Sequence, residues 1–341
     1  MKRLLLSILV VFVISCSDDE GGEPFIPSAT GTNVIVLNEG NFQTANGSIS
    51  VYNTATEEVN HKVFQNNNSS RPLGDVVQSM VRIDDRYFVV VNNSNKIEVV
   101  NSSDFRSVGK IDGFNSPRYI LPISTTKAYV SDLFEDKIYV INPQTLTISN
   151  TINTGGWTEE MVLIDKRAFV CHVDSNQIYV FNVENDSLLG KIPTNLQPQH
   201  LEVDAEGMIW VSCSGGINQG FPALHRIDPT TMLVEETLEL NDNSKSIGEL
   251  ELNPDKTKLI YLMEDVFELS IHEKSLPSAS KISADGRLFY GIGVDKASGE
   301  IYLSDAIDYL QRGVIYRMDS TGSGITTFKS GIMPGGFFFQ Y

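Results

Sequence analysis

Residues 116–152 form a unit that recurs along almost the whole chain. The unit holds three short apolar segments, at 119–123, 127–130 and 137–141, and a weaker fourth at 147–152. Each segment is rich in β-branched and aromatic residues, and turn-forming residues separate one segment from the next. The unit therefore predicts four short antiparallel strands connected in sequence.

Copies of the third segment give the period of the repeat. Successive copies lie about 40 to 48 residues apart, which is typical of β-propeller blades with four strands. Helical periodicity is absent from the chain after the N-terminal segment. The sequence therefore predicts an all-β, seven-bladed β-propeller. The third segments lie at 48–52, 96–100, 137–141, 177–181, 224–227, 266–269 and 313–317.

The first repeat shows only three of its four strands, at 34–37, 47–52 and 58–64. Its missing inner strand is expected at 332–339, because that segment aligns with 115–121. A C-terminal strand that completes blade one would pair both open sheet edges and close the ring. The complete repeats are expected at 72–111, 115–152, 157–192, 198–240, 247–282 and 288–328.

The charge balance and the cysteines restrict the function classes. The chain has 43 acidic and 26 basic residues, a net charge of −17, which argues against nucleic-acid binding. Cys171 and Cys213 lie in second strands of neighbouring repeats, one position apart in register. A one-residue offset points side chains to opposite sheet faces, so we expect two buried free thiols rather than a disulfide.

The N-terminus has the pattern of an export signal. Lys2 and Arg3 precede a short apolar run, and Ser15 precedes Cys16. This arrangement resembles the bacterial lipobox, which implies that 1–16 is a lipoprotein signal and that Cys16 is lipidated; the alternative is an ordinary secretory signal. Residues 17–32 are expected to be a flexible tether, and 33–341 the propeller.

Residues 17–20 are Ser-Asp-Asp-Glu, which resembles the acidic tag that directs Bacteroidetes-type lipoproteins to the outer face of the outer membrane. The alternative is that these acidic residues only keep the linker solvated. The resemblance implies a lipid-anchored protein of the outer membrane that faces the extracellular side, with membrane contact through the lipid alone.

Two further stretches carry a family resemblance. Residues 128–132 followed by 138–143 resemble the YVTN repeat of YncE-like propellers, and 36–42 with 334–339 resemble surface lipoproteins of the DUF5074 group. Lipoproteins of similar build, the BtuG type, sit over TonB-dependent transporters and capture cobalamin. The resemblance thus implies ligand capture for such a transporter, although the sequence has no cobalamin-specific motif.

The repeat alignment places polar residues at equivalent positions where the inner strands begin. These positions hold Gln78, Arg118, Glu159, Gln199 and Tyr290, and two glycines complete the set. Convergent polar groups with aromatic walls are typical of a small-molecule site. The alternative is that the polar residues line a water-filled channel and the aromatic residues seal the blades. Neighbouring loops are expected to add Trp157, Asn38, Glu39, Asn41, Phe42, Phe114, Phe134, His172 and Phe221.

Catalysis has little support in the sequence. The five histidines are scattered, although His172 and His200 could approach one another beside Glu159 or Glu39 and imitate an acid/base or metal cluster. We therefore expect a non-catalytic protein without cofactor or metal, which captures a small molecule such as cobalamin for a TonB-dependent receptor. The alternatives are an adhesion propeller that binds a protein or a glycan and, as an outsider, a propeller lyase.

Overall fold

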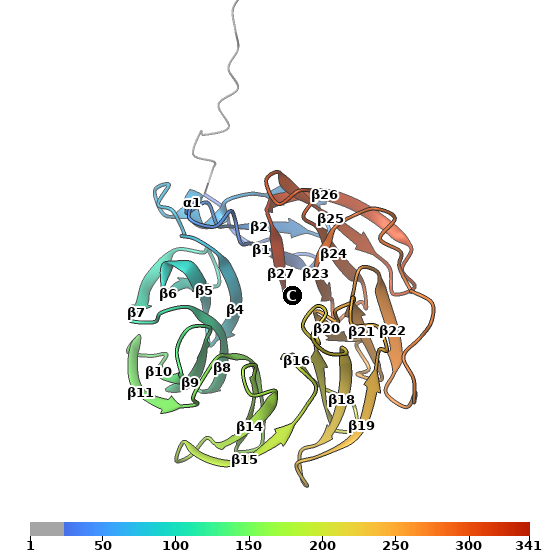
Figure 1. The fold of residues 1–341 in the computed structure, drawn as a ribbon. Helices are drawn as coiled ribbons and strands as arrows, with labels where there is room; N and C mark the ends of the chain where they lie inside the picture. The colour runs from blue at the N-terminus through green and yellow to red at the C-terminus, as the bar shows by residue number, and fades with distance from the viewer. Residues whose placement is uncertain (1–23) are drawn as a thin grey trace, which may run out of the picture.

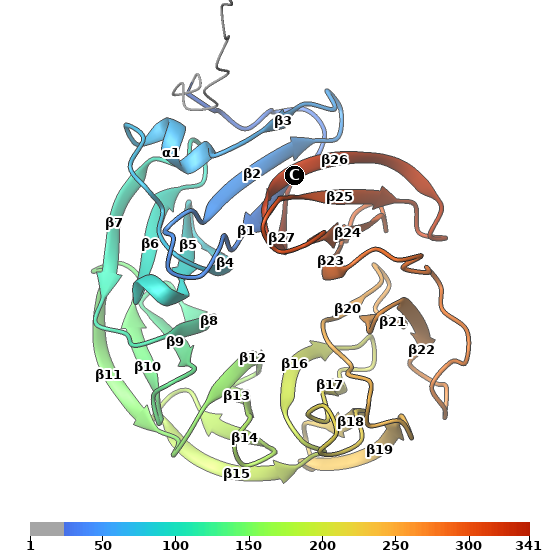
Figure 2. The ribbon, with the colours of Figure 1, turned by 45° about the horizontal axis from the view of Figure 1, so that its top comes forward.

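The computed structural model describes residues 24–341, and these residues form seven blades arranged in a ring (Figures 1 and 2). Each blade is an antiparallel sheet, and in blades two to seven the strand that comes first in the chain lies nearest the axis of the ring. The predicted seven-bladed β-propeller is confirmed.

Five of the blades follow the repeat strand by strand. Their strands, taken from the axis outward, are listed here by blade. Blade two has β4 (Val77–Ile83), β5 (Arg86–Val91), β6 (Lys96–Asn101) and β7 (Ser107–Asp112); blade three has β8 (Pro117–Ser124), β9 (Lys127–Asp132), β10 (Lys137–Asn142) and β11 (Thr147–Asn153); blade four has β12 (Thr158–Ile164), β13 (Arg167–His172), β14 (Gln177–Asn182) and β15 (Ser187–Pro193); blade five has β16 (Pro198–Val203), β17 (Ile209–Cys213), β18 (Ala223–Asp228) and β19 (Leu233–Glu239); blade seven has β23 (Phe289–Val294), β24 (Ile301–Asp305), β25 (Arg312–Met318) and β26 (Gly324–Ile332).

Blade one combines the two ends of the propeller. Its inner strand is β27 (Pro334–Gln340), which pairs with β1 (Asn33–Asn38), and β2 (Ser48–Asn53) and β3 (Val59–Asn60) follow outward. In the register of β27 and β1, Phe338 lies opposite Ile35. The expected closure by the C-terminal strand is confirmed.

Two blades depart from the predicted pattern. The strand expected at 58–64 ends after two residues, and α1 (Val63–Asn67) follows it. The helix allows Val63 and Phe64 to be fully buried between blades one and two. Blade six has three strands, β20 (Leu250–Leu252), β21 (Lys258–Leu262) and β22 (Val266–Ser270), and its fourth is reduced to a single bridge between Val266 and Ile282. Pro277 interrupts the segment before this bridge, because proline has no N–H for a strand ladder.

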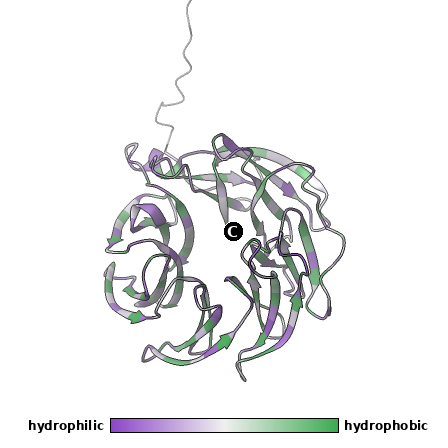
Figure 3. Cartoon of the chain, viewed as in Figure 1, coloured by the Kyte–Doolittle hydropathy of each residue, from purple (hydrophilic) through white to green (hydrophobic). Residues whose placement is uncertain are grey.

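The hydrophobic core is divided among the interfaces between blades. Residues 24–341 contain seven clusters of buried apolar side chains, and each cluster combines residues from two adjacent blades. Trp210 is the largest fully buried side chain, and its Nε1 donates to Asp204 Oδ2 at 3.0 Å. Hydrophobic stretches accordingly run along the strands of the blades (Figure 3). Every blade is therefore stabilised by both of its neighbours.

Cys171 and Cys213 are both free and fully buried. The predicted pair of buried free thiols is therefore confirmed, although both cysteines belong to the same cluster, between blades four and five. They do point to opposite faces of their own sheets. In the ring, one face of blade four packs against the opposite face of blade five. The one-residue offset between the two cysteines therefore directs both thiols into the interface between these blades.

The expected signal, lipidated Cys16 and acidic tag fall in residues 1–23, outside the described part of the chain. Between residues 24 and 341, no helix is long and apolar enough to cross a membrane.

Candidate functional site

A recurring β-bulge places one residue from most inner strands at the axis. The register between the first and second strands shifts at the start of blades two, three, four, five and seven, and β27 skips one residue opposite β1. A bulge leaves one residue unpaired and re-aims its side chain. The bulged residues include Gln78, Arg118, Glu159, Gln199, Tyr290 and Gly335.

Three of the predicted polar residues, together with Trp157 from a neighbouring loop, form one connected group at the entrance of the channel. Arg118 Nε donates to Glu159 Oε1 at 2.8 Å, and Arg118 Nη1 donates to Gln78 Oε1. Trp157 Nε1 donates to the same Glu159 oxygen at 2.6 Å. Glu159 is almost fully buried, so these donors compensate for the loss of water around its carboxylate.

Across the entrance, the Tyr290 hydroxyl donates to Glu39 Oε2 at 2.9 Å. Gly335 makes this contact possible, because a Cβ at that position would lie 2.7 Å from Glu39 Oε1. Gly248 borders open space in the entrance, because a Cβ added at this position would have only Leu262 O within 4 Å, at 3.4 Å. Gln199 and Gly248 line the same entrance.

A second ring of side chains lies directly below the first, and the sequence analysis did not assign it to the site. These side chains bind the backbone of the next blade. Ser79 Oγ donates to Arg118 O at 2.7 Å, while Glu160 Oε2 accepts from Leu201 N at 3.0 Å. Likewise, Glu249 Oε2 accepts from Ile292 N at 2.7 Å. They satisfy backbone groups that the inner edge of each sheet leaves unpaired.

Further acidic groups extend the channel inward. His200 Nδ1 lies 3.2 Å from Glu160 Oε1, and Lys296 Nζ lies 2.5 Å from Glu251 Oε2. Glu202 lines the channel close to Glu251, and no hydrogen bond joins its side chain to any residue in 24–341. The sequence does contain a signal for this acidic side of the channel. Polar residues alternate at 200 and 202 and again at 249 and 251, and alternate residues of a strand share one face.

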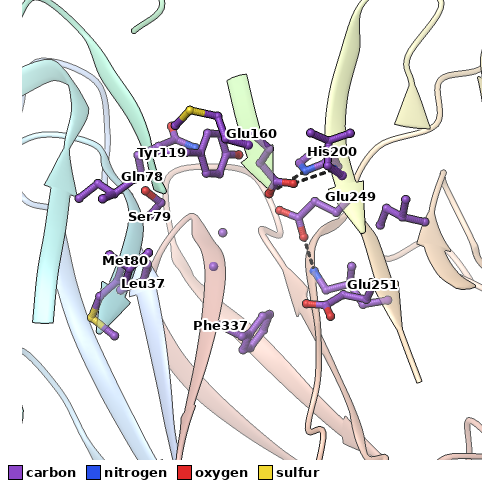
Figure 4. Close-up of a pocket in the computed structure, with 18 of the residues that line it drawn as sticks. Leu37, Gln78, Ser79, Met80, Tyr119, Glu160, His200, Glu249, Glu251 and Phe337 are labelled. Atoms are coloured by element: carbon purple, nitrogen blue, oxygen red, sulfur yellow. Dashed lines mark hydrogen bonds and ion pairs between the residues drawn. The ribbon is translucent and has the colours of Figure 1, made fainter. Parts of the chain in front are cut away.

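Two adjoining cavities make up the channel. The entrance cavity, of about 430 Å³, is bordered by Arg118, Gln199, Gly248 and Tyr290, and the inner cavity, of about 360 Å³, by Glu202 and Glu251. Both are bordered by Glu39, Gln78, Tyr119, His200 and Glu249. Figure 4 shows His200, Glu249 and Glu251 on one side, and Leu37 and Met80 on the other. These volumes are in the range of small-molecule sites.

Burial controls the protonation of the acidic wall. It raises the pKa of Glu249 to about 8, although the nearby His200 opposes the shift. Burial, together with the charge of Glu251, also raises the pKa of Glu202 to about 8. Burial alone would lower the pKa of His200, but the charge and hydrogen bond of Glu160 raise it to about 9. At neutral pH, His200 is therefore a cation, and Glu202 and Glu249 are largely uncharged.

Three of the residues proposed from the sequence lie in the framework of the propeller and do not line the channel. Asn38 is fully buried and accepts hydrogen bonds from Ser330 and Gly331, so it fastens β1 to the end of β26. Phe114 is buried edge-on against Tyr139. His172 is buried and stacks on Tyr179, with Nδ1 bonded to Ser175.

The remaining predicted residues lie on the loops around the entrance. Phe42 and Phe134 are 65% and 70% exposed, and Phe221 is 38% exposed. Asn41 donates to Tyr309 O on the loop between β24 and β25. His172 bonds to Ser175 and His200 to Glu160, so the two histidines have separate partners. No three acidic, His or Cys side chains in the described chain are close enough together to hold a metal ion.

Residues 32–250 match the family described as Domain of unknown function (DUF5074). The chain belongs to the DUF5074 family. The resemblance to the DUF5074 group is therefore confirmed, while the finer likeness to YncE-like and BtuG-type lipoproteins remains a proposal. No curated protein matches this DUF5074 chain.

Solved structures similar to this DUF5074 protein are propellers with low sequence identity. A quinonprotein alcohol dehydrogenase-like protein from Bacteroides thetaiotaomicron has a TM-score of 0.70 at 11% identity, over 90% of this chain and 77% of its own. A protein from Lactobacillus plantarum has a TM-score of 0.68 at 14% identity, over 91% and 100%. Kuenenia stuttgartiensis hydrazine synthase has a TM-score of 0.58 at 14% identity, over 73% and 85%. At these identities the likeness concerns the fold alone.

Proposed function

We propose that this DUF5074 protein is a non-catalytic capture protein that binds a small molecule in its central channel. The observation that carries the proposal is the continuous channel formed by the entrance and inner cavities, whose lining combines polar groups such as His200 and Glu249 with apolar groups such as Leu37 and Met80. Such a mixed lining in a cavity of this size is usual for a small-molecule site.

The wider proposal places this capture protein at the outer surface of the outer membrane, anchored through Cys16, where it passes its ligand to a TonB-dependent receptor. It is supported by the lipobox-like N-terminus and by the resemblance to BtuG-type lipoproteins. A ligand as large as cobalamin would extend beyond the channel and contact the exposed loops around the entrance, including Phe42 and Phe134.

The test uses mass spectrometry of small molecules that the purified protein retains. Gly248→Phe should abolish retention, because the new ring would enter the entrance cavity without displacing packed atoms. Gly324→Phe is the matched control: it adds the same ring to the exposed strand β26, where nothing lies within 4 Å of a Cβ. Equal retention by both variants would place the ligand elsewhere. If the purified protein retains nothing, cobalamin is the first compound to titrate.

The exposed apolar side chains favour a second candidate, a protein-binding face. The loops between second and third strands carry Phe42, Phe134, Ile217 and Leu310, which are 64–71% exposed. These loops lie on the face on which the channel opens, so their exposed apolar side chains could contribute to one interaction surface around the entrance. A Phe134→Ser/Leu310→Ser variant that keeps ligand retention and loses a cross-linked partner on intact cells would support this candidate.

A further inference from the structure

The channel has more carboxyl groups than cations. Six glutamates line or border it, namely Glu39, Glu159, Glu160, Glu202, Glu249 and Glu251. Three of them have ion-pair partners: Arg118 pairs with Glu159, His200 with Glu160 and Lys296 with Glu251. Within residues 24–341, the other three have no cation at ion-pair distance.

The contacts of these three glutamates differ. Glu39 accepts a hydrogen bond from Tyr290, and Glu249 accepts one from the backbone of β23. The Glu202 side chain is partly buried, lines the channel and has no hydrogen bond in the described chain. A carboxyl group that is partly shielded from water and has no protein partner is less favourable than a hydrogen-bonded one. A donor that entered the channel would therefore be stabilised most at Glu202.

Apolar side chains also line the inner cavity. Leu37 and Met80 lie across from His200, Glu249 and Glu251, on the same side as Gln78 and Ser79, and Phe337 lies at the lower end of the view (Figure 4). The carboxyl groups are spread from Glu39 at the entrance to Glu251 deeper in the channel, and they do not converge on one point as metal ligands do. This arrangement suits an elongated cation with an apolar part.

We infer that the ligand of the channel is an organic amine, whose ammonium group is bound by Glu202 and Glu249 and whose carbon skeleton lies against Leu37, Met80 and Phe337. The inference rests on the proposed function, since it names the ligand class of the same channel. Binding involves ionic hydrogen bonds and apolar contact, and the only bonds that change are the O–H bonds of the carboxyl groups, whose protons pass to the solvent.

Binding of an amine is coupled to proton release. Because the pKa of Glu202 and of Glu249 is about 8, both carboxyl groups carry protons at neutral pH, and an ammonium ion beside them favours their ionised forms. The charged groups around Glu249 are His200, Glu160 and Glu251. Those around Glu202 are Glu251, Lys296, Glu160 and Lys256. Affinity for an amine should therefore rise between pH 6.5 and 8.5, where an alkylammonium with a pKa near 10 stays charged.

The test is calorimetric titration of the purified protein with phenethylamine and cadaverine, with phenylethanol as the uncharged match of the first. Titrations at pH 7 in two buffers of different ionisation enthalpy give the number of protons released. We expect both amines to bind with proton release and phenylethanol not to bind. Binding of phenylethanol as strong as that of phenethylamine, or no binding of either amine at millimolar concentration, would overturn the inference.

Charge-removing variants identify the groups responsible. Glu202→Gln and Glu249→Gln should each weaken amine binding at least about tenfold and reduce the proton release, because each removes an acceptor for the ammonium. Glu264→Gln, which removes one charge on an exposed loop, should leave both unchanged. If the protein instead retains a neutral, anionic or metal ligand that Gly248→Phe displaces, the amine inference fails and the proposed function stands.

Discussion

At the scale of single residues, the Arg118–Glu159 pair stabilises the entrance of the channel. Arg118→Ala would leave Glu159 buried without its main donor, so we expect the free energy of unfolding to fall by about 2–3 kcal/mol, less than for a fully buried pair because Arg118 keeps some solvent contact. Urea denaturation measures the loss. The Arg118→Ala/Glu159→Gln double variant should recover part of it, and additive losses would show that the two residues are not coupled.

The raised pKa values in the channel predict that stability falls in alkaline solution. Glu202, Glu249 and His200 have pKa values of about 8, 8 and 9 in the folded protein, above their ordinary values. Between its pKa in the unfolded protein and its higher pKa in the folded protein, each group binds more protons in the folded state. Over that interval, each unit of rising pH lowers the free energy of unfolding by up to about 1.4 kcal/mol per group.

The clearest window for this effect is pH 6.5 to 9. Burial lowers the pKa of His61 and of His225 to about 4. Between pH 4 and 6.5 these two histidines make the free energy of unfolding rise with pH, which offsets the opposite effect of the two glutamates. We expect Tm to fall steadily from pH 6.5 to 9 by differential scanning calorimetry, and Glu249→Gln to flatten the slope. A Tm that rises across this window would contradict the raised pKa values.

The sequence revealed the first ring of the channel but not the second. Gln78 and Arg118 could be aligned because the repeat is nearly gapless at the entrance of each inner strand. Glu159 and Glu160 both point into the channel because they form the bulge of β12 opposite β13. An alignment of the repeats alone does not reveal such a bulge. The same limit applies to Asn38, whose burial depends on contacts with a strand almost at the other end of the chain.

At the scale of elements, β27 joins two interfaces at once. Its Phe338 packs between blades one and two, while Phe337 and Phe339 pack between blades seven and one. Removal of residues 334–341 should lower Tm by more than about 10 °C or prevent folding, because it strips an inner strand and opens two cores. Removal of Tyr341 alone, which loses one hydrogen bond to Asp295, is the control and should change Tm little. A long truncation that kept its Tm would contradict the role of β27 in closure.

The strands themselves were largely predictable, because alternating apolar residues and turn signals are local features. The two failures have tertiary causes. The short β3 gives way to α1 because Val63 and Phe64 fill the gap between blades one and two. The fourth strand of blade six is absent between 271 and 281, where Pro277 and several serines replace the β-branched residues of the other repeats.

At the scale of the whole molecule, the proposed anchor gives a prediction about location. Cys16→Ala should release the protein from membranes, since lipid is the only anchor that the sequence predicts. Cell fractionation after a salt wash measures the shift, and Ser17→Ala, which leaves the cysteine in place, is the matched control. A Cys16→Ala protein that stays in the membrane fraction would refute the proposed lipid anchor.

The composite nature of blade one also sets the order of events when the protein is made. The ribosome produces β1 first and its partner β27 last, so every other strand exists before the ring can close. A chain that stops before β27 contains all the other strands of the propeller and still has no complete circle. The synthesis of β27 thus decides whether the earlier strands become a native propeller or remain an open arc with two unpaired edges, which can pair with another chain.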